Sequence, residues 1–248
     1  MILRLSPVLA VITILGSASV APADSLVLRP FSAEYKIRVS ILSGKSTMTL
    51  GREENGDYIF KSRARAAGLL RLFVRGVIEE TSRFAVRDGR VQPLWFKRVD
   101  TVSDDDRDME LEFDWTNGIL LRSYDDRTEK LEIPENAMDP SLVLIAVMVD
   151  RMHGRAPGPY ALIDHDRTEL LTIIDEGPEI TKTRAGKFST TRYSHYMEEL
   201  DRTTRLWVSQ EIDYITVRMA QYDSGKKRAS LKLTKLSIDD SLESMDEP

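Results

Sequence analysis

The chain has 248 residues, of which 42% are hydrophobic and 30% charged, and its formal net charge is −5. This composition excludes a disordered protein, and the length suits one large all-β domain or two small ones. Cysteine is absent, which excludes disulfides, thiolate metal sites and a lipid-modified N-terminal cysteine. The acidic balance gives no support to nucleic-acid binding, which normally requires a basic surface.

The first 23 residues have the pattern of a signal peptide. Arg4 precedes an apolar run from Leu5 to Leu15, and small residues follow up to Ala23. The run is shorter than the roughly 20 residues that a membrane-spanning helix needs. We therefore expect cleavage after about Ala23 and export to the periplasm, without a lipid anchor and with no transmembrane span after cleavage. An uncleaved membrane anchor is the alternative interpretation.

Residues 24–238 are predicted to form a single β domain, and residues 239–248 an acidic flexible tail. Turn dipeptides divide this domain into β-rich segments, as is typical of hairpins. They are Ser43-Gly44, Asn55-Gly56, Asp88-Gly89, Asn117-Gly118, Ala185-Gly186 and Ser224-Gly225. Between them, apolar and polar side chains alternate, for example over 35–41 and 109–115. This alternation predicts strands with one buried and one solvated face.

One segment does not alternate, because every position from Leu142 to Val149 is apolar. Asp139 is a suitable N-cap, Pro140 fits the first helical turn, and Gly154 can adopt the left-handed exit. These signals predict a helix. The many β-branched residues in the segment leave a buried strand as the alternative.

The predicted fold combines these elements. A helix that is apolar on all sides is expected to be enclosed. We therefore predict a mainly β protein in which a strongly curved antiparallel sheet, an open barrel or β-roll, wraps around one apolar helix. The loop at 155–159 is expected to separate two halves of this sheet, with strands over about 30–133 and about 159–238.

Four segments carry a resemblance to a known family. Residues 62–73, 78–84, 206–209 and 214–218 resemble DUF3108, a domain of unknown function found in exported proteins of Gram-negative bacteria. The resemblance covers roughly residues 30–237. It implies a periplasmic, mostly β protein without an assigned activity. The expected shape is also similar to that of the lipoprotein carriers LolA and LolB, and a likeness of shape alone does not transfer function.

The segment 66–76 is the first candidate site, because apolar side chains occupy both of its alternating faces and glycines bracket them. We predict that it forms the lip of an apolar cavity, where the arginines meet an anionic head group. The predicted ligand-binding residues are Leu69, Leu70, Arg71, Leu72, Phe73 and Arg75, together with Glu80 on the next strand. The alternative is a strand covered on both sides, with its arginines reaching water.

Glu80 is expected on the apolar face of its strand, beside Phe84. There it would orient a ligand or act as a general acid. The alternative is a structural ion pair with Arg63 or Arg65 on a neighbouring strand.

The three histidines are His153, His165 and His195, and their spacing fits no local metal motif. We therefore expect no metal site and no cofactor. His195 with Glu199 is a candidate proton-transfer pair, and a strand that ends in an acidic turn explains the same residues. The sequence contains no recognised catalytic motif, so no residue is assigned as catalytic.

The leading functional prediction is a non-enzymatic periplasmic binding or carrier protein for an apolar or amphiphilic, lipid-like ligand of the cell envelope. A hydrolase or lyase that acts on envelope polysaccharide through Glu80 or His195 is one alternative. A scaffold that docks an envelope protein partner through an exposed sheet edge is another.

Overall fold

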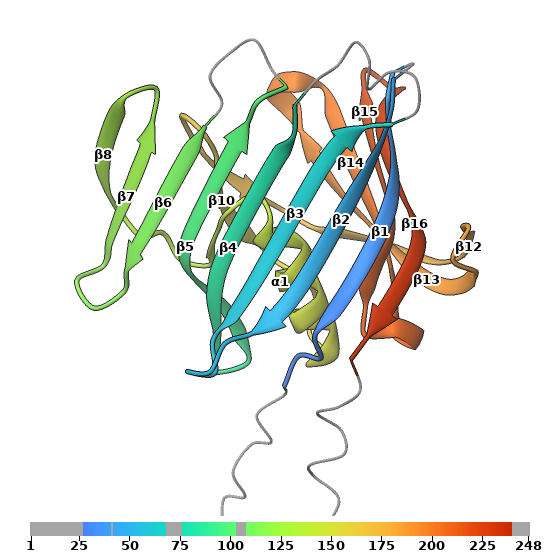
Figure 1. The fold of residues 1–248 in the computed structure, drawn as a ribbon, viewed down its shortest axis with the longest axis horizontal. Helices are drawn as coiled ribbons and strands as arrows, with labels where there is room; N and C mark the ends of the chain where they lie inside the picture. The colour runs from blue at the N-terminus through green and yellow to red at the C-terminus, as the bar shows by residue number, and fades with distance from the viewer. Residues whose placement is uncertain (1–26, 41, 68–75, 103–107, 240–248) are drawn as a thin grey trace, which may run out of the picture.

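The computed structural model describes residues 27–40, 42–67, 76–102 and 108–239. In these parts of the chain, thirteen antiparallel strands form one strongly curved sheet (Figure 1). Its strands are β1 (Phe31–Val39), β2 (Leu42–Arg52), β3 (Tyr58–Ala66), β4 (Ile78–Arg87), β5 (Arg90–Asp100), β6 (Met109–Asp114), β7 (Ile119–Tyr124), β8 (Arg127–Glu132), β12 (Ile174–Lys182), β13 (Lys187–Met197), β14 (Arg202–Ser209), β15 (Ile215–Asp223) and β16 (Lys226–Ile238). The predicted curved antiparallel sheet is therefore confirmed.

The first and last strands of the chain pair with each other and so join the two halves of the sheet. The order is β12-β13-β14-β15-β16-β1-β2-β3-β4-β5-β6-β7-β8, so β16 pairs with β1 while the other pairs are neighbours in sequence. The register runs from Phe31 opposite Ile238 to Val39 opposite Ala229. The expected division into an early and a late half is correct for this sheet.

A second, small sheet was not predicted. Its strands are β9 (Ala137–Met138), β10 (Tyr160–Ile163) and β11 (Thr168–Leu171), and β10 pairs in parallel with β9. The prediction that all strands after residue 159 join one sheet is therefore wrong for β10 and β11. The reason is that β10 finds its partner just before the helix, in a pair of residues too short to show a strand pattern.

The apolar segment forms the helix α1 (Leu142–Met152), which decides against the buried strand. Its start differs from the prediction, because Ser141 holds the N-cap position. Asp139 still serves the helix: its Oδ1 atom accepts hydrogen bonds of 2.9 Å from the backbone N–H groups of Ser141 and Leu142. Gly154 has the predicted left-handed conformation, with φ of +69°.

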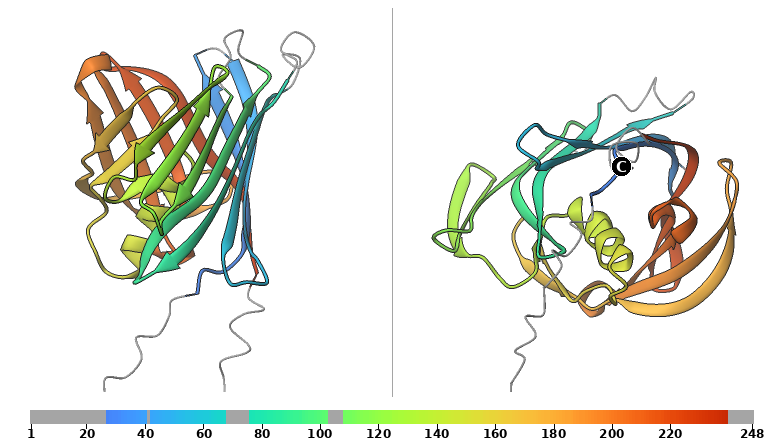
Figure 2. Two further views of the ribbon diagram at one scale, coloured as in Figure 1. Left: turned by 90° about the vertical axis from the view of Figure 1, so that its left-hand side faces the viewer. Right: turned by 90° about the horizontal axis from the view of Figure 1, so that it is seen from below.

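The curved sheet encloses α1, as Figure 2 shows from below. Side chains from opposite sides of the helix, such as Ile145 and Val147, are buried. They belong to one core with inward-facing side chains of the sheet, among them Tyr35, Phe60 and Leu233. Because the helix meets apolar surface on several sides, its apolar character all round is stabilising.

Five of the six predicted turns join strands, and the one at Ser43-Gly44 is wrong. Gly44 lies inside β2, where a Cβ atom would stand 2.8 Å from the carbonyl oxygen of Arg65 on β3. The glycine is therefore explained by a close approach of two backbones. The chain reverses direction earlier, where Ser40 has a positive φ of 52°.

Several predicted segments lie outside the described residues. They are the signal peptide 1–23, the part 240–248 of the acidic tail, and the ligand-binding residues Leu69, Leu70, Arg71, Leu72, Phe73 and Arg75. Within the described residues, no helix has the length and apolar character needed to cross a bilayer.

Candidate functional site

A cavity of about 390 Å³ lies between α1 and the inner face of the sheet. Its lining is mainly apolar and comes from three directions. The helix supplies Val143, Leu144 and Val147, the large sheet supplies Met48, Phe60, Tyr193, Leu206 and Met219, and the region of the small sheet supplies Leu162, Leu171 and Ile173. This volume lies within the usual range of small-molecule sites, about 300–1,000 Å³.

The packing of α1 explains why space is left there. Ile145, Ala146 and Met148 are buried in the core, whereas Val143 and Leu144 are only partly buried and line the cavity. One side of the helix is thus packed and the other meets a space that side chains do not fill. Cores are normally packed without such voids, so a cavity of this size is a feature to be explained.

Glu80 is the acidic residue on the cavity wall that holds the start of the helix to the sheet. Its Oε2 atom accepts a 2.8 Å hydrogen bond from the hydroxyl of Ser141, and its Oε1 atom lies 3.4 Å from Nη1 of Arg98 on β5. The inward orientation of Glu80 is as predicted. The alternative, a structural ion pair with Arg63 or Arg65, is wrong in its partner, because Glu80 pairs with Arg98 and Arg63 pairs with Glu79 at 3.1 Å.

Asp139 lies beside Glu80 and is fully buried. Burial raises the pKa of Asp139 to about 7, and the negative charge of Glu80 adds to this rise, while three hydrogen bonds oppose it. The donors are the hydroxyl of Ser82 and the backbone N–H groups of Ser141 and Leu142, each at 2.9 Å. Two carboxyl groups therefore lie at the start of α1, next to the cavity, and one of them titrates near neutral pH.

His195 lines the cavity from β13. Its Nε2 atom lies 3.2 Å from Oε1 of Glu169 on β11, and its Nδ1 atom lies 3.3 Å from the carbonyl oxygen of Thr172. The predicted pairing of His195 with Glu199 is wrong. Glu199 lies in the short 3-10 turn η2 (Glu198–Leu200) that follows β13, and it approaches Arg167 at 3.7 Å.

Two arginines also line the cavity, and they differ in how well they are paired. Arg202 makes two hydrogen bonds, of 2.8 and 3.3 Å, to the carboxylate of Asp223. Arg167 lies 3.7 Å from the carboxylate of Glu199, whose side chain is 81% exposed, and its Nη2 atom lies 4.0 Å from the sulfur atom of Met197. The buried Nε atom of Arg167 has no hydrogen-bond partner in the described part of the chain. Arg167 is therefore the cation that is available to an acidic ligand.

Metal binding has no support in the described residues, where no group of three or more histidine, aspartate or glutamate side chains could hold an ion. The lining of the cavity is mainly apolar and includes a few polar side chains, among them His195 and Arg167. Its chemistry suits the burial of a hydrocarbon segment and the pairing of one acidic group.

A family model described as a protein of unknown function (DUF3108) matches residues 30–232. The chain belongs to the DUF3108 family. The DUF3108 chain matches no curated protein.

Among solved structures, a β-barrel-like protein of the domain of unknown function DUF1849 from Brucella abortus is similar to this DUF3108 protein. The two share 13% sequence identity and a TM-score of 0.54 over 86% of this chain and 99% of that one. The likeness shows a shared fold. The Pseudomonas aeruginosa MucA/MucB complex matches with a TM-score of 0.40 and 8% identity, over 86% of this chain and 52% of that one.

The sequence pointed to part of this site in the DUF3108 protein. Glu80 and His195, which were considered for different functions, line the same cavity. The strongest missed residues are Leu144 and Arg167. The apolar character of α1 could have indicated Leu144, since an all-apolar helix need not pack on every side. No local pattern signalled Arg167, which reaches the cavity through the pairing of β10 with β11.

Proposed function

We propose that this DUF3108 protein is a periplasmic carrier that binds an apolar or amphiphilic envelope ligand between α1 and the curved sheet. The observation that carries the proposal is the apolar cavity of about 390 Å³. Binding there removes hydrocarbon from water, at roughly 25 cal/mol for each Å² of apolar surface buried. The carrier is non-enzymatic in this proposal, because a binding role requires only the cavity.

Arg167 supports an acidic head group on this ligand. A charge-assisted hydrogen bond to a carboxylate or phosphate supplies the partner that the buried Nε atom of Arg167 lacks. The apolar lining from Leu144, Leu171 and Leu206 supports an acyl or similar chain. A monoacyl amphiphile combines these two features.

The periplasmic location and the ends of the domain belong to the same proposal. The signal-peptide pattern of residues 1–23 supports export of a domain that comprises residues 24–238. Residues Leu69, Leu70, Leu72 and Phe73, with Arg71 and Arg75, remain proposed as the lip of the ligand site. They connect β3 to β4, the strands that carry the cavity residues Ser62 and Glu80.

Native mass spectrometry of the protein isolated gently from its own periplasm tests the proposal. We expect a mass above that of the polypeptide, and the release of a discrete lipid-like compound on denaturation. A bare polypeptide mass, together with no saturable uptake of a fluorescent fatty acid, would overturn it. Capture of periplasmic partners then tests the scaffold instead.

The second candidate function is hydrolysis or elimination on an envelope polysaccharide. It is favoured by one observation, the pair formed by His195 and Glu169 on the wall of the cavity. A screen of cell-wall glycans tests it, with Glu80→Gln and His195→Ala as variants. Glycan cleavage that both variants abolish supports this function, and no cleavage by the unmodified protein removes it.

A further inference from the structure

Two exposed aliphatic side chains stand at one end of the inner face of the sheet. Val39 ends β1 and Leu42 begins β2, and the two residues are opposite each other. Alternate residues of a strand share a face, so Val39 lies on the same side as Tyr35 and Ile37. Along this face of β1 the exposure rises from 2% at Tyr35, through the partly buried Ile37, to 50% at Val39, and Leu42 is 41% exposed. The apolar interior therefore continues to the solvent at this end of the sheet.

Neighbouring strands connect the exposed pair with the cavity. Val39 is opposite Ala229 of β16, and Ala229 is opposite Gln221 of β15, which lines the cavity. Adjacent strands lie about 4.8 Å apart, so two strand spacings, roughly 10 Å, separate Val39 from Gln221. The exposed pair and this part of the cavity wall thus lie on one face, at the same level of the sheet.

A second line of neighbours lies two residues further along the same strands. Ile37 is opposite Leu231 of β16, and Leu231 is opposite Met219 of β15, another residue of the cavity lining. Five residues with apolar side chains therefore lead from the solvent to the cavity, and they are here called the entrance track. They are Val39, Leu42, Ala229, Ile37 and Leu231.

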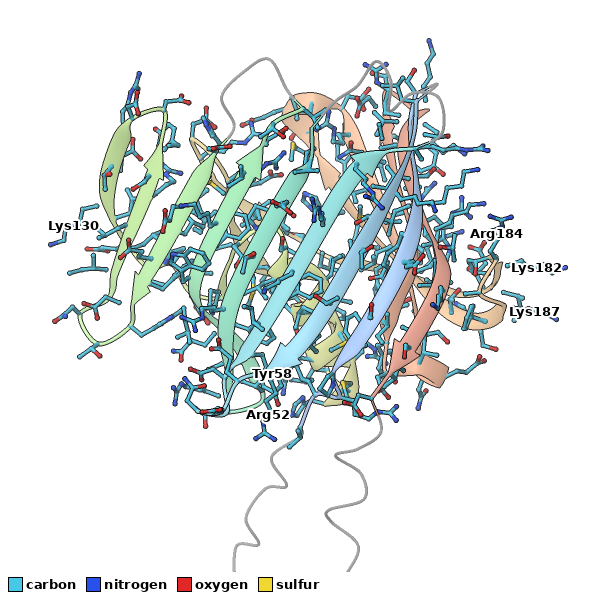
Figure 3. All side chains as sticks on the ribbon, viewed as in Figure 1. Arg52, Tyr58, Lys130, Lys182, Arg184 and Lys187 are labelled. Carbon is cyan, nitrogen blue, oxygen red and sulfur yellow. The ribbon has the colours of Figure 1, made fainter. Side chains whose placement is uncertain are left out.

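The other end of the curved sheet is closed. β2 runs from Leu42 to Arg52, which is opposite Tyr58 at the start of β3, and Figure 3 shows Arg52 and Tyr58 at the lower end of these strands. The ring of Tyr58 stacks on Phe84 at 5.3 Å, and its hydroxyl accepts a 3.1 Å hydrogen bond from the backbone N–H of Leu28. Tyr58 is 4% exposed, and Phe84 and Leu28 are fully buried. The end of the interior that reaches solvent is therefore the one at the entrance track.

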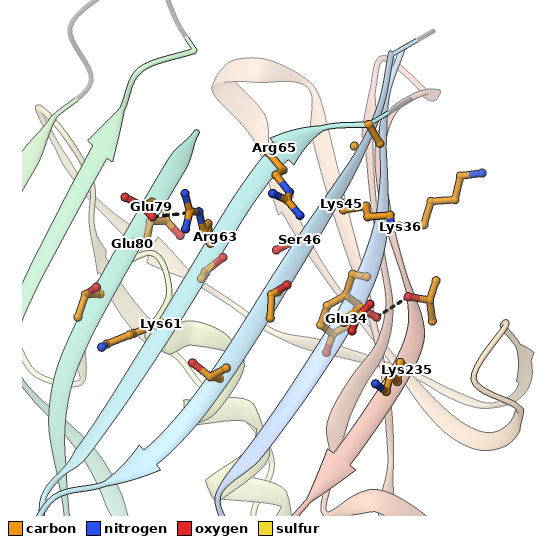
Figure 4. A pocket seen from close by; sticks show the side chains of 18 of the residues that line it. Glu34, Lys36, Lys45, Ser46, Lys61, Arg63, Arg65, Glu79, Glu80 and Lys235 are labelled. Atoms are coloured by element: carbon orange, nitrogen blue, oxygen red, sulfur yellow. Dashed lines mark hydrogen bonds and ion pairs between the residues drawn. The ribbon is translucent and has the colours of Figure 1, made fainter. Parts of the chain in front are cut away.

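The outer face of the same strands has the opposite character. Lys36 and Arg38 alternate with the track residues of β1, and Lys36 is opposite Lys45 of β2. Figure 4 shows Lys36 and Lys45 on these two strands. A strand end that met only water would not require apolar residues on one of its faces. Contact with an apolar molecule explains why aliphatic side chains continue to the exposed end of the inner face.

We propose that the apolar part of the ligand enters and leaves the cavity along the entrance track, with Val39 and Leu42 at its opening. This proposal rests on the carrier function and adds the route of the ligand. A side chain that contacts the ligand only in transit changes the height of the barrier and leaves the bound state unchanged. The association and dissociation rate constants then change by the same factor, and the dissociation constant stays the same.

Stopped-flow fluorescence with cis-parinaric acid, a fatty acid that is itself fluorescent, measures both rate constants. Val39→Ser with Leu42→Ser should slow uptake and release by about ten-fold each, because apolar contact at the opening is lost. The dissociation constant should change by less than about two-fold. Leu170→Ser with Ile180→Ser is the matched control, since these side chains are 65% and 52% exposed and lie outside the cavity lining. This control should exchange the fatty acid like the unmodified protein.

A reversible obstruction of the opening gives a second measurement. The chain contains no cysteine, so Leu42→Cys carries a single thiol for modification with a bulky methanethiosulfonate reagent. Modification should slow uptake and release, and a reducing agent should restore both rates in the same sample. The same reagent on Ile180→Cys should have no effect. Urea midpoints confirm that all variants fold.

The outcomes separate the entrance from the carrier function. Binding of cis-parinaric acid at rates that neither the serine variant nor the label changes would overturn the entrance alone. A weaker dissociation constant with an unchanged association rate would also overturn it, because Val39 and Leu42 would then contact the bound ligand. No binding by the unmodified protein would overturn the carrier function and the entrance together.

Discussion

The hydroxyl of Ser141 donates a 2.8 Å hydrogen bond to the carboxylate of Glu80, and this bond ties the start of α1 to the fourth strand of the sheet. The two residues are 61 positions apart in the sequence. The bond fixes the end of the helix that lies beside the cavity, since both residues line that space. It is therefore a contact on which both stability and the shape of the site depend.

Ser141→Ala should lower the free energy of unfolding by about 1.5–3 kcal/mol, because hydrogen bonds to charged groups contribute about this much. The measurement is urea unfolding followed by circular dichroism. Ser237→Ala, at an exposed position of β16, is the control and should unfold like the unmodified protein. Equal midpoints for the two variants would contradict the structural role of the Ser141–Glu80 bond.

Asp139 should make stability depend on pH. Its pKa is about 7 in the folded protein and about 3.9 in an unfolded chain, so the folded state binds the proton more tightly. Stability is therefore highest below the unfolded pKa and falls as the pH rises toward 7, by at most about 1.4 kcal/mol per pH unit. Asp139→Asn should flatten this slope between about pH 4 and 7, whereas Asp166→Asn, at an exposed position, should keep it. A slope that survives in Asp139→Asn would place its origin elsewhere.

Leu144→Trp should fill part of the cavity and abolish ligand uptake. The indole occupies space that the unmodified protein leaves open, so we expect at least a ten-fold loss in affinity for a fluorescent fatty acid, with a change in unfolding free energy of no more than about 1–3 kcal/mol. Leu170→Trp makes the same chemical change on an exposed side chain outside the cavity. Unchanged uptake by Leu144→Trp would move the binding site away from α1.

Arg167→Gln should discriminate between acidic and neutral ligands. Loss of a charge-assisted hydrogen bond of about 1.5–3 kcal/mol should weaken binding of a fatty acid by at least ten-fold. Binding of a neutral monoacylglycerol should change little. Competition titrations with both compounds measure this, and Arg127→Gln on the edge strand β8 is the control. Equal losses for the two ligands would assign Arg167 a structural role instead.

Gly44→Ala should destabilise the sheet, because the added Cβ atom would stand 2.8 Å from the carbonyl oxygen of Arg65. Overpacking of this kind costs about 1–3 kcal/mol. Gly51→Ala on the same strand is the matched control, since its Cβ atom would meet only a side-chain methyl group of Ile59 at 3.4 Å. Thermal unfolding of both variants distinguishes close backbone approach from the general effect of removing a strand glycine.

The elements that could be predicted are those that local patterns determine. The alternation around Tyr35 and the unbroken apolar run of α1 each reflect the environment of consecutive residues, and both predictions agree with the structure. Gly44 misled the turn prediction, because its role depends on a backbone that follows 21 residues later. Local patterns do not contain such tertiary contacts.

The partners of the candidate site residues could not be predicted for the same reason. His195 contacts Glu169 because β13 and β11 meet at the cavity, and Glu80 contacts Arg98 because β4 pairs with β5. For His195, the expected partner Glu199 is nearer in sequence. For Glu80, the expected partners Arg63 and Arg65 lie on the neighbouring strand β3, and their side chains face outward. Strand order and facing determine these contacts, and a single sequence leaves them open.

The pairing of β1 with β16 has a consequence for how the chain folds. The first and last strands meet at the inner part of the sheet, and the backbone N–H of Asp239 donates to the carbonyl oxygen of Pro30 at 2.8 Å. Contacts between such distant residues carry a large loop-closure entropy and slow folding. During synthesis the N-terminus emerges first. The two halves of the sheet therefore cannot join around the helix until the last strand, β16, has been made. Until then the apolar surfaces of the chain stay exposed, which makes the newly made protein a natural client for chaperones.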